Sequence, residues 1–163
     1  MDDDDDGVVP VFVEIEQHSN EKWEWNHETQ TLELDRMLPA PYKYPFAYGF
    51  IPDTLGGDGD ALDALIVTVS SHPLIQQMTY EVRIVGVLVM EDEQGRDEKM
   101  LCVLEKDWIQ GIRELEHLPL KSRDDIQYFF AHYKSKTPRK WSRVHGLLGR
   151  KDAIELYWKS HTS

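Results

Sequence analysis

The sequence predicts an α+β fold in which short strands curl into a small β-barrel and helices follow them. The first two thirds of the 163 residues consist of apolar and β-branched runs separated by turn signals, and the last third changes to a helical period. Strands followed by segregated helices are typical of this architecture. The length fits one domain and is too short for two full ones.

Six runs in the first part of the chain have the composition of β-strands. They are residues 8–15, 22–25, 31–36, 65–69, 80–90 and 99–104. Turn-forming residues lie between some of them. Residues 26–29 predict a hairpin between two short strands, and residues 92–95 predict another between two longer strands.

Two helices are predicted in the last third. Ser122 is the expected N-cap of the first, because Asp124 and Asp125 follow it at the end where the helix dipole favours negative charge. Its apolar face is formed by Ile126, Phe129, Phe130 and Tyr133. A shorter helix is expected over residues 151–159, and both should pack on the strands.

The chain is acidic, with a formal net charge of −12, and an N-terminal run of five aspartates, residues 2–6, contributes part of it. The remainder still carries −7, which disfavours a general nucleic-acid binder. Residues 1–7 are predicted to form a disordered acidic tail, because like charges repel and apolar residues begin only at Val8. Metal binding by this tail is an alternative. Residues 8–163 are expected to form the single domain.

Cys102 is the only cysteine and lies in an apolar run, so burial in a reducing compartment is expected. No stretch reaches the roughly 18–20 apolar residues of a membrane span, and the acidic start is unlike a signal peptide. We therefore expect a cytoplasmic protein without a membrane partner.

The segment with the most chemical information holds three carboxylates in six residues. Asp58, Asp60 and Asp63 lie between the aromatic run 44–50 and the apolar run 64–67. Carboxylates that share a site raise one another's pKa, so this crowding requires either full solvation or hard cations. Oxygen-only ligands favour magnesium, manganese or calcium.

Other charged residues could complete such a site. A second acidic cluster covers residues 92–99, at the predicted hairpin turn, and isolated cations occur at Lys22, Arg36, Lys99 and Lys134. Each feature alone is also compatible with a solvated surface. Together, metal-holding carboxylates and oxyanion-holding cations are the components of phosphoryl transfer.

The order of these motifs resembles the soluble inorganic pyrophosphatases of family I. The resemblance covers roughly residues 8–135 and rests on Glu14, Lys22-Trp23-Glu24, Asp35-Arg36, residues 44–52, 58–63 and 92–99, and Tyr133-Lys134. It implies a small closed five-stranded β-barrel, OB-like, with additional strands and two C-terminal helices. It also implies hydrolysis of pyrophosphate to two phosphates by direct attack of a metal-activated water, with several Mg²⁺ ions per site and Mn²⁺ as a substitute.

The same resemblance implies a role for each matching residue. Asp60 takes the place of the general base. The expected metal ligands are Glu14, Asp58, Asp63, Asp92 and Asp97. The expected substrate contacts are Lys22, Arg36, Tyr48, Lys99, Tyr133 and Lys134. Tyr44 and Glu24 match supporting positions.

Ala61 and Glu16 stand where many relatives have proline, but neither change removes a ligand. For a chain of this length the resemblance implies a homo-oligomer, with a hexamer expected. Two alternatives stay open. One is a calcium-binding structural module, although strands instead of helices should flank the aspartate motif. The other is a barrel that binds single-stranded nucleic acid through the aromatic run, which the acidic charge disfavours.

Overall fold

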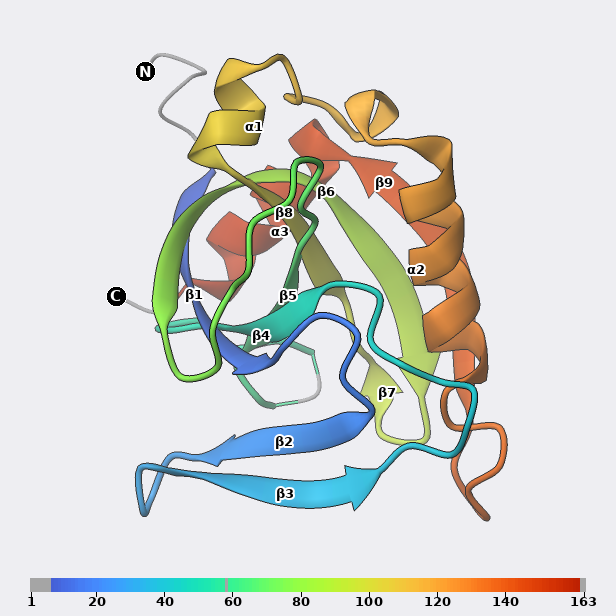
Figure 1. Ribbon diagram of the computed structural model, residues 1–163. Coiled ribbons are helices and arrows are strands. Elements are labelled where there is room, and N and C mark those ends of the chain that lie inside the picture. The colour runs from blue at the N-terminus through green and yellow to red at the C-terminus, as the bar shows by residue number, and fades with distance from the viewer. Residues whose placement is uncertain (1–6, 58, 162–163) are drawn as a thin grey trace.

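The computed structural model describes residues 7–57 and 59–161 of the chain (Figure 1). The elements are, in order, β1 (Val8–Ile15), β2 (Glu21–Asn26), β3 (Thr31–Met37), β4 (Ala47–Ile51), β5 (Leu62–Ile66), β6 (Thr79–Asp92), β7 (Gly95–Arg96), β8 (Lys99–Leu104), α1 (Glu105–Ile109), the 3₁₀ helix η2 (Leu115–His117), α2 (Leu120–His132), β9 (Ser142–Gly149) and α3 (Arg150–Ser160).

Five strands pair into a closed ring. β1 pairs with β4, β4 with β5, β5 with β8 and β8 with β6, and β6 returns to pair with β1. All these pairs are antiparallel except β5 with β8. The predicted α+β fold built on a small five-stranded ring is therefore confirmed, and each of the five strands pairs with two others of the ring.

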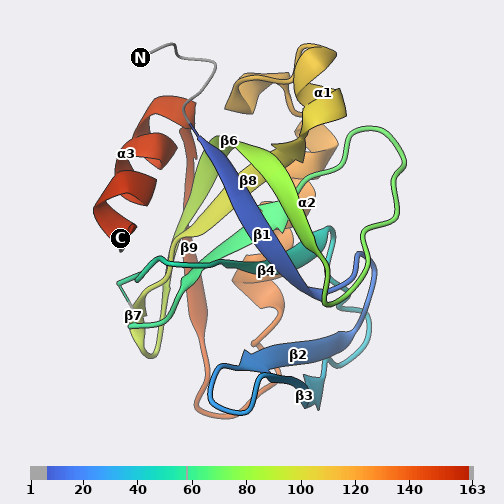
Figure 2. The same ribbon diagram turned by 90° about the vertical axis from the view of Figure 1, so that its left-hand side faces the viewer.

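The remaining strands extend this ring. β7 and β9 both pair with β6, and β2 and β3 form a separate two-stranded sheet. Figure 1 shows this β2–β3 hairpin below the ring, and Figure 2 shows it at the same end from the side. The hairpin thus faces one end of the ring, where a cavity can form between the two sheets.

The ring is filled by apolar side chains from all five of its strands. Val11, Ala64, Ile84 and Cys102 belong to one buried cluster, and Tyr157 of α3 packs into the same cluster. Alternate residues of these strands face a second cluster that includes Phe130 of α2. Both predicted C-terminal helices therefore pack on the strands, and Cys102 is buried as expected.

Strand β4 was not predicted, because its sequence contains a glycine and follows Pro45. The close approach of β1 explains the glycine. A Cβ atom at Gly49 would lie 1.8 Å from the carbonyl oxygen of Phe12, so no other residue fits here without moving the backbone. Gly49 consequently lets two strands meet while its neighbours Tyr48 and Phe50 carry side chains toward the cavity.

Other boundaries also differ from the predictions. β9 was missed because Gly146, Gly149 and charged residues interrupt its apolar pattern. α1 was missed because it has only five residues. Ser122 is not the N-cap of α2: the helix starts at Leu120 after the extended Pro119, which supplies no side-chain cap. The predicted strand 65–69 begins earlier, at Leu62, and so includes Asp63.

The predicted acidic tail is described only from Gly7, since residues 1–6 lie outside the described part of the chain, as does Asp58. Gly7 is buried, and its carbonyl accepts a hydrogen bond from the amide of Ile84 at 2.8 Å. Among the helices of the described residues, none is long and apolar enough to cross a membrane.

Candidate active site

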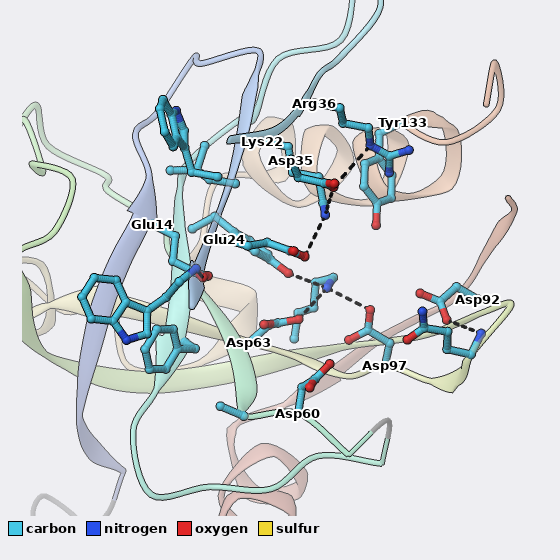
Figure 3. Close-up of a pocket in the computed structure, with 18 of the residues that line it drawn as sticks. Glu14, Lys22, Glu24, Asp35, Arg36, Asp60, Asp63, Asp92, Asp97 and Tyr133 are labelled. Carbon is cyan, nitrogen blue, oxygen red and sulfur yellow. Dashed lines mark hydrogen bonds and ion pairs between the residues drawn. The ribbon is translucent and has the colours of Figure 1, made fainter. Parts of the chain in front are cut away.

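A cavity of about 400 Å³ lies between the hairpin and the end of the ring (Figure 3). Its walls come from β1, β2, β3, β4, β5 and β8, from the 92–97 turn and from the end of α2. The predicted site residues that line it are Glu14, Lys22, Arg36, Tyr48, Asp60, Asp63, Asp92, Asp97, Lys99, Tyr133 and Lys134, together with the supporting residue Glu24. Segments more than one hundred residues apart in the sequence thus meet in one polar cavity.

The floor of the cavity is built by strand register. Asp63 on β5 and Lys99 on β8 are direct partners in the parallel pairing. The ammonium of Lys99 lies 3.0 Å from Oδ2 of Asp63, 3.0 Å from Oδ2 of Asp97 and 2.7 Å from the hydroxyl of Tyr48. One cation therefore holds two carboxylates and a phenol in place.

Burial controls the protonation of this group. It raises the pKa of Asp63 to about 6, with Lys99 opposing and Asp97 adding to that effect. Burial alone would lower the pKa of Lys99, but the charges of Asp63, Tyr48 and Asp97 raise it well above its ordinary value. The pKa of Tyr48 is also raised well above its ordinary value by burial. Lys99 thus stays charged, and Tyr48 keeps its proton.

The hairpin brings two further cations to the opposite wall. Lys22 on β2 and Arg36 on β3 are register partners. The Lys22 ammonium donates to Asp35 at 2.9 Å and to Glu24 at 3.0 Å. Burial would lower the pKa of Lys22, but these two carboxylates raise it overall, and the Lys22 hydrogen bond lowers the pKa of Asp35. Lys22 is therefore a firmly charged group fixed at the cavity wall.

The guanidinium of Arg36 has donors that need an acceptor. Its Nε and Nη2 atoms are buried, and within the described residues neither has a hydrogen-bond partner. Nε lies 3.9 Å from Oδ2 of Asp35, and Nη1 reaches Thr137 at 3.5 Å. Buried donors without acceptors are unfavourable. An anion with several oxygen atoms would satisfy them.

The end of α2 supplies a third wall. Tyr133 is the C-cap of the helix, and burial raises the pKa of its hydroxyl. Lys134 follows it and donates to Asp92 at 2.9 Å and to Glu93 at 3.3 Å. Burial would raise the pKa of Asp92, but Lys134 and the amide of Gln94 lower it overall. Asp92 is thus an ionised carboxylate at the cavity edge.

Glu14 on β1 is the last of the predicted metal-binding carboxylates that line the cavity. It is buried, and its Oε2 accepts the amide hydrogen of Trp25 at 2.8 Å. Burial raises its pKa to about 8, although the Trp25 hydrogen bond opposes the shift. The indole of Trp25 packs on the phenyl group of Phe12, with centroids 4.8 Å apart. This contact therefore also joins the β2–β3 hairpin to the five-stranded ring.

Two residues of the predicted set, Tyr44 and Asp58, are not among the described residues that line the cavity. Tyr44 is buried beneath the cavity, where its ring packs 5.3 Å from that of Tyr48, so it supports the lining without forming it. Asp58 lies outside the described residues. Among the charged lining residues, the sequence assigned no role to Asp35, Glu93 and Lys140. Asp35 precedes Arg36 and Glu93 follows Asp92 in the sequence. Their positions next to predicted site residues were the only sequence feature that could have indicated that they line the cavity.

The donor set of the cavity suits a hard cation. Its candidate ligands are carboxylates, and hard divalent ions prefer oxygen. Raised pKa values at Glu14 and Asp63 mean that ionising these carboxylates is costly without added positive charge. Within residues 7–57 and 59–161, no three acidic, histidine or cysteine side chains are already arranged to hold an ion. Lys99 occupies the position between Asp63 and Asp97 instead.

Comparisons with known proteins agree with this geometry. The family model described as inorganic pyrophosphatase matches residues 11–163. An inorganic pyrophosphatase from Thermus thermophilus is 40% identical over 151 residues, which cover 91% of this chain and 85% of that protein. One from Sulfolobus acidocaldarius is 40% identical over 142 residues, which cover 85% and 81% of the two chains.

A solved structure shares the arrangement of elements as well. The crystal structure of inorganic pyrophosphatase from Thermus thermophilus superposes with a TM-score of 0.88 at 37% identity, over 98% of this chain and 92% of that chain. The similarity therefore extends over both the ring and the segments that line the cavity.

Proposed function

Since the chain belongs to the inorganic pyrophosphatase family, hydrolases that act on pyrophosphate, we propose that it cleaves pyrophosphate to two phosphates with the help of hard divalent cations, Mg²⁺ first among them. The pocket supports this proposal because it combines carboxylates with cations and phenols in one cavity. A tetra-anionic substrate and its counter-ions require both kinds of group.

Asp63, Asp92 and Asp97 are the residues that would hold the cations, together with Asp58, which precedes Asp63 in the same sequence motif, and Glu14 at the margin. When bound, such ions lower the pKa of an attacking water and neutralise phosphate charge. Lys99 would keep Asp63 and Asp97 close together before a cation binds, because its ammonium contacts both carboxylates. Lys99 would therefore share these oxygen atoms with a bound cation.

The substrate would be held by the cations of the other two walls. Arg36 supplies buried donors at Nε and Nη2, and Lys22 and Lys134 supply fixed positive charge. The raised pKa of Tyr133 keeps its hydroxyl protonated, so that it can donate to a phosphate oxygen. These contacts orient one phosphoryl group and stabilise the charge that collects on the leaving phosphate.

Asp60 is the proposed general base. It lines the same cavity, on the loop between β4 and β5, three residues before Asp63. A carboxylate there can accept the proton of the attacking water as the new P–O bond forms and the bridging P–O bond breaks. No serine or cysteine nucleophile is needed, and the buried Cys102 does not line the cavity.

The observation that carries this function is the Arg36 guanidinium, buried with two unsatisfied donors in a cavity rich in carboxylates. The test measures phosphate release from pyrophosphate with Mg²⁺, Mn²⁺ or Ca²⁺ and with a chelator. We expect turnover with Mg²⁺ and its loss with the chelator. A wild-type chain that is inert with every divalent ion would refute the proposal.

We further propose that the chain forms a homo-oligomer, with a hexamer favoured, in the cytoplasm. Large apolar side chains are exposed on both C-terminal helices, including Leu120 and Tyr128 of α2 and Trp158 of α3. Surfaces of this kind are often covered by other subunits. Light scattering of the purified chain measures the assembled mass, and a monomer would contradict this part of the proposal.

A further inference from the structure

The side chain of Thr54 joins the two ends of the loop that carries Asp60. This loop runs from the end of β4 at Ile51 to the start of β5 at Leu62, and the structure describes it apart from Asp58. The Thr54 hydroxyl donates to the carbonyl of Ile51 at 2.6 Å and accepts from the amide of Leu62 at 2.9 Å. Thr54 is buried, with 7% exposure. One buried hydroxyl therefore closes the loop at its base.

The two hydrogen bonds use both roles of the hydroxyl. A carbonyl only accepts and an amide N–H only donates, so the hydroxyl gives its single proton to Ile51 and accepts from Leu62. These two residues are also the last partners in the pairing of β4 with β5. Valine has nearly the shape of threonine but can neither donate nor accept. Thr54→Val would therefore deprive two backbone groups of their side-chain partner without changing the packing volume much.

The next two residues extend this link to α3 and to Asp60. The amide of Leu55 donates to the carbonyl of Ser160, the last residue of α3, at 2.7 Å. The amide of Gly56 donates to the carbonyl of Asp60, also at 2.7 Å. Three consecutive residues, 54 to 56, thus bind the base of the loop, the end of α3 and Asp60 in turn.

The position of the loop depends on these hydrogen bonds because a second cavity borders it. This cavity has a volume of about 400 Å³, and Thr54, Asp60 and His27 of the β2–β3 turn are among the residues that line it. Asp53, directly before Thr54, has φ +60°, a left-handed conformation that costs free energy and persists where surrounding contacts hold it. Loss of the Thr54 hydrogen bonds would therefore let the loop relax into this space and move Asp60.

We propose that Thr54 is a positioning residue for the reaction, because it holds the Asp60 backbone where the carboxylate reaches the attacking water. This inference rests on the proposed role of Asp60 as the general base. Figure 3 shows the Asp60 side chain pointing into the active-site cavity, whereas Thr54 does not line that cavity and so acts through Asp60. A displacement of about 1 Å at a reacting group costs about 100-fold in rate. Lys22 and Arg36 lie on the β2–β3 hairpin, so substrate binding should change little.

Two substitutions at Thr54 test this proposal. Thr54→Val removes both hydrogen bonds, and Thr54→Ser keeps the hydroxyl and loses only a methyl group. With saturating Mg²⁺, Thr54→Val should lower kcat for phosphate release by about 10–100-fold while KM changes by less than about threefold, and Thr54→Ser should keep kcat within about threefold of the wild-type value. Ser70→Ala is the control, because it removes a hydroxyl that donates to Asp107 at 2.7 Å outside both cavities. Its kcat should equal that of the wild-type chain.

A mutant cycle with Asp60→Asn separates positioning from general destabilisation. If Thr54 acts through the Asp60 carboxylate, Thr54→Val should lower kcat by less than about twofold in the Asp60→Asn background. Equal fold losses of kcat in the two backgrounds, or a wild-type kcat in Thr54→Val, would overturn the inference. Both of these outcomes require an active wild-type chain. A wild-type chain that releases no phosphate would instead refute the proposed function, and this inference with it.

A backbone substitution gives a second test, which stands even if Thr54→Val does not fold. Replacement of Gly56 by glycolic acid turns its amide into an ester and removes the N–H that donates to Asp60, while every side chain stays the same. We expect kcat to fall by about tenfold or more with little change in KM. The same replacement at Gly111 is the matched control, because its amide donates to the carbonyl of Trp108 at 3.0 Å in a turn that does not line the active-site cavity. A wild-type kcat in the Gly56 ester would overturn the inference.

Discussion

The ammonium of Lys99 lies 3.0 Å from Oδ2 of Asp63, across the one parallel pairing of the ring. Lys99 is only 1% exposed, and the pKa of Asp63 is raised to about 6. The pair is therefore a buried charge interaction at the floor of the cavity, set by strand register. It links the stability of the ring to the chemistry of the site.

Lys99→Met tests this link through stability. Removing the ammonium leaves Asp63 and Asp97 facing each other in a buried position, so the free energy of unfolding should fall by about 3 kcal/mol in a chelator. Urea unfolding measures it, with Lys106→Met on the exposed surface of α1 as the control. Because a bound cation can replace the lost charge, Mg²⁺ should recover part of the loss. If the urea midpoint in the chelator did not change, the ion pair of Lys99 with Asp63 would contribute nothing to the free energy of unfolding.

Arg36 can be tested by two substitutions that separate charge from geometry. Arg36→Gln removes the positive charge, and Arg36→Lys keeps it but loses the paired donors at Nε and Nη2. We expect both to lower kcat/KM by about 10–100-fold, since a hydrogen bond to a charged group contributes about 1.5–3 kcal/mol. Steady-state phosphate release measures this, with Arg143→Gln as control, because Arg143 on β9 is exposed and does not line the cavity. Full activity of Arg36→Lys would mean that charge alone suffices.

The sequence predicted more of the residues that line the cavity than of the strands that carry them. Asp63, Asp97 and Lys99 stand in a recognisable order of charged motifs, whereas β4 and β9 contain glycines that hide their strand character. Gly49 illustrates the cause: it is required by the close passage of Phe12, a contact between segments far apart in the sequence. Such contacts leave no local periodicity to detect.

Local patterns also could not reveal which partners each charge would have. The resemblance predicts that Lys99 is a substrate contact. Its position between Asp63 and Asp97, however, depends on the pairing of β5 with β8. Likewise, Arg83, Arg113 and Arg150 are widely spaced along the chain and meet only in the folded protein. Register and packing decide these contacts, and both depend on the whole fold.

Asp60→Asn tests the general base. The amide keeps the size of the side chain but cannot accept the proton, so kcat should fall by about 10²–10⁴-fold. Divalent-ion affinity should change little, and calorimetry with Mg²⁺ measures it. Asp53→Asn is the matched control, because this exposed aspartate lies on the same loop and does not line the active-site cavity. Loss of Mg²⁺ binding in Asp60→Asn would identify Asp60 as a ligand instead of a base.

Cys102 allows a pH test that leaves the active site untouched. Its thiol is fully buried in the ring, and burial raises its pKa above the ordinary value of about 9.0. The folded state holds the thiol proton more tightly than the unfolded state does. The protonated thiol of Cys102 therefore adds its full contribution to stability below pH 9, and this contribution is lost as the pH rises above 9. The wild-type chain should therefore lose up to about 1.4 kcal/mol per pH unit there from this one group.

Cys102→Ala removes that titration while the other groups stay the same. At pH 7 we expect the variant to be less stable by about 1 kcal/mol, because truncation leaves a small void in the ring core. Between pH 9 and 10 the difference should shrink or reverse, since only the wild-type chain loses the thiol contribution. Urea unfolding at pH 7, 8, 9 and 10 measures the difference. A constant gap across this range would mean that the folded and unfolded thiols share one pKa, which is incompatible with a fully buried Cys102.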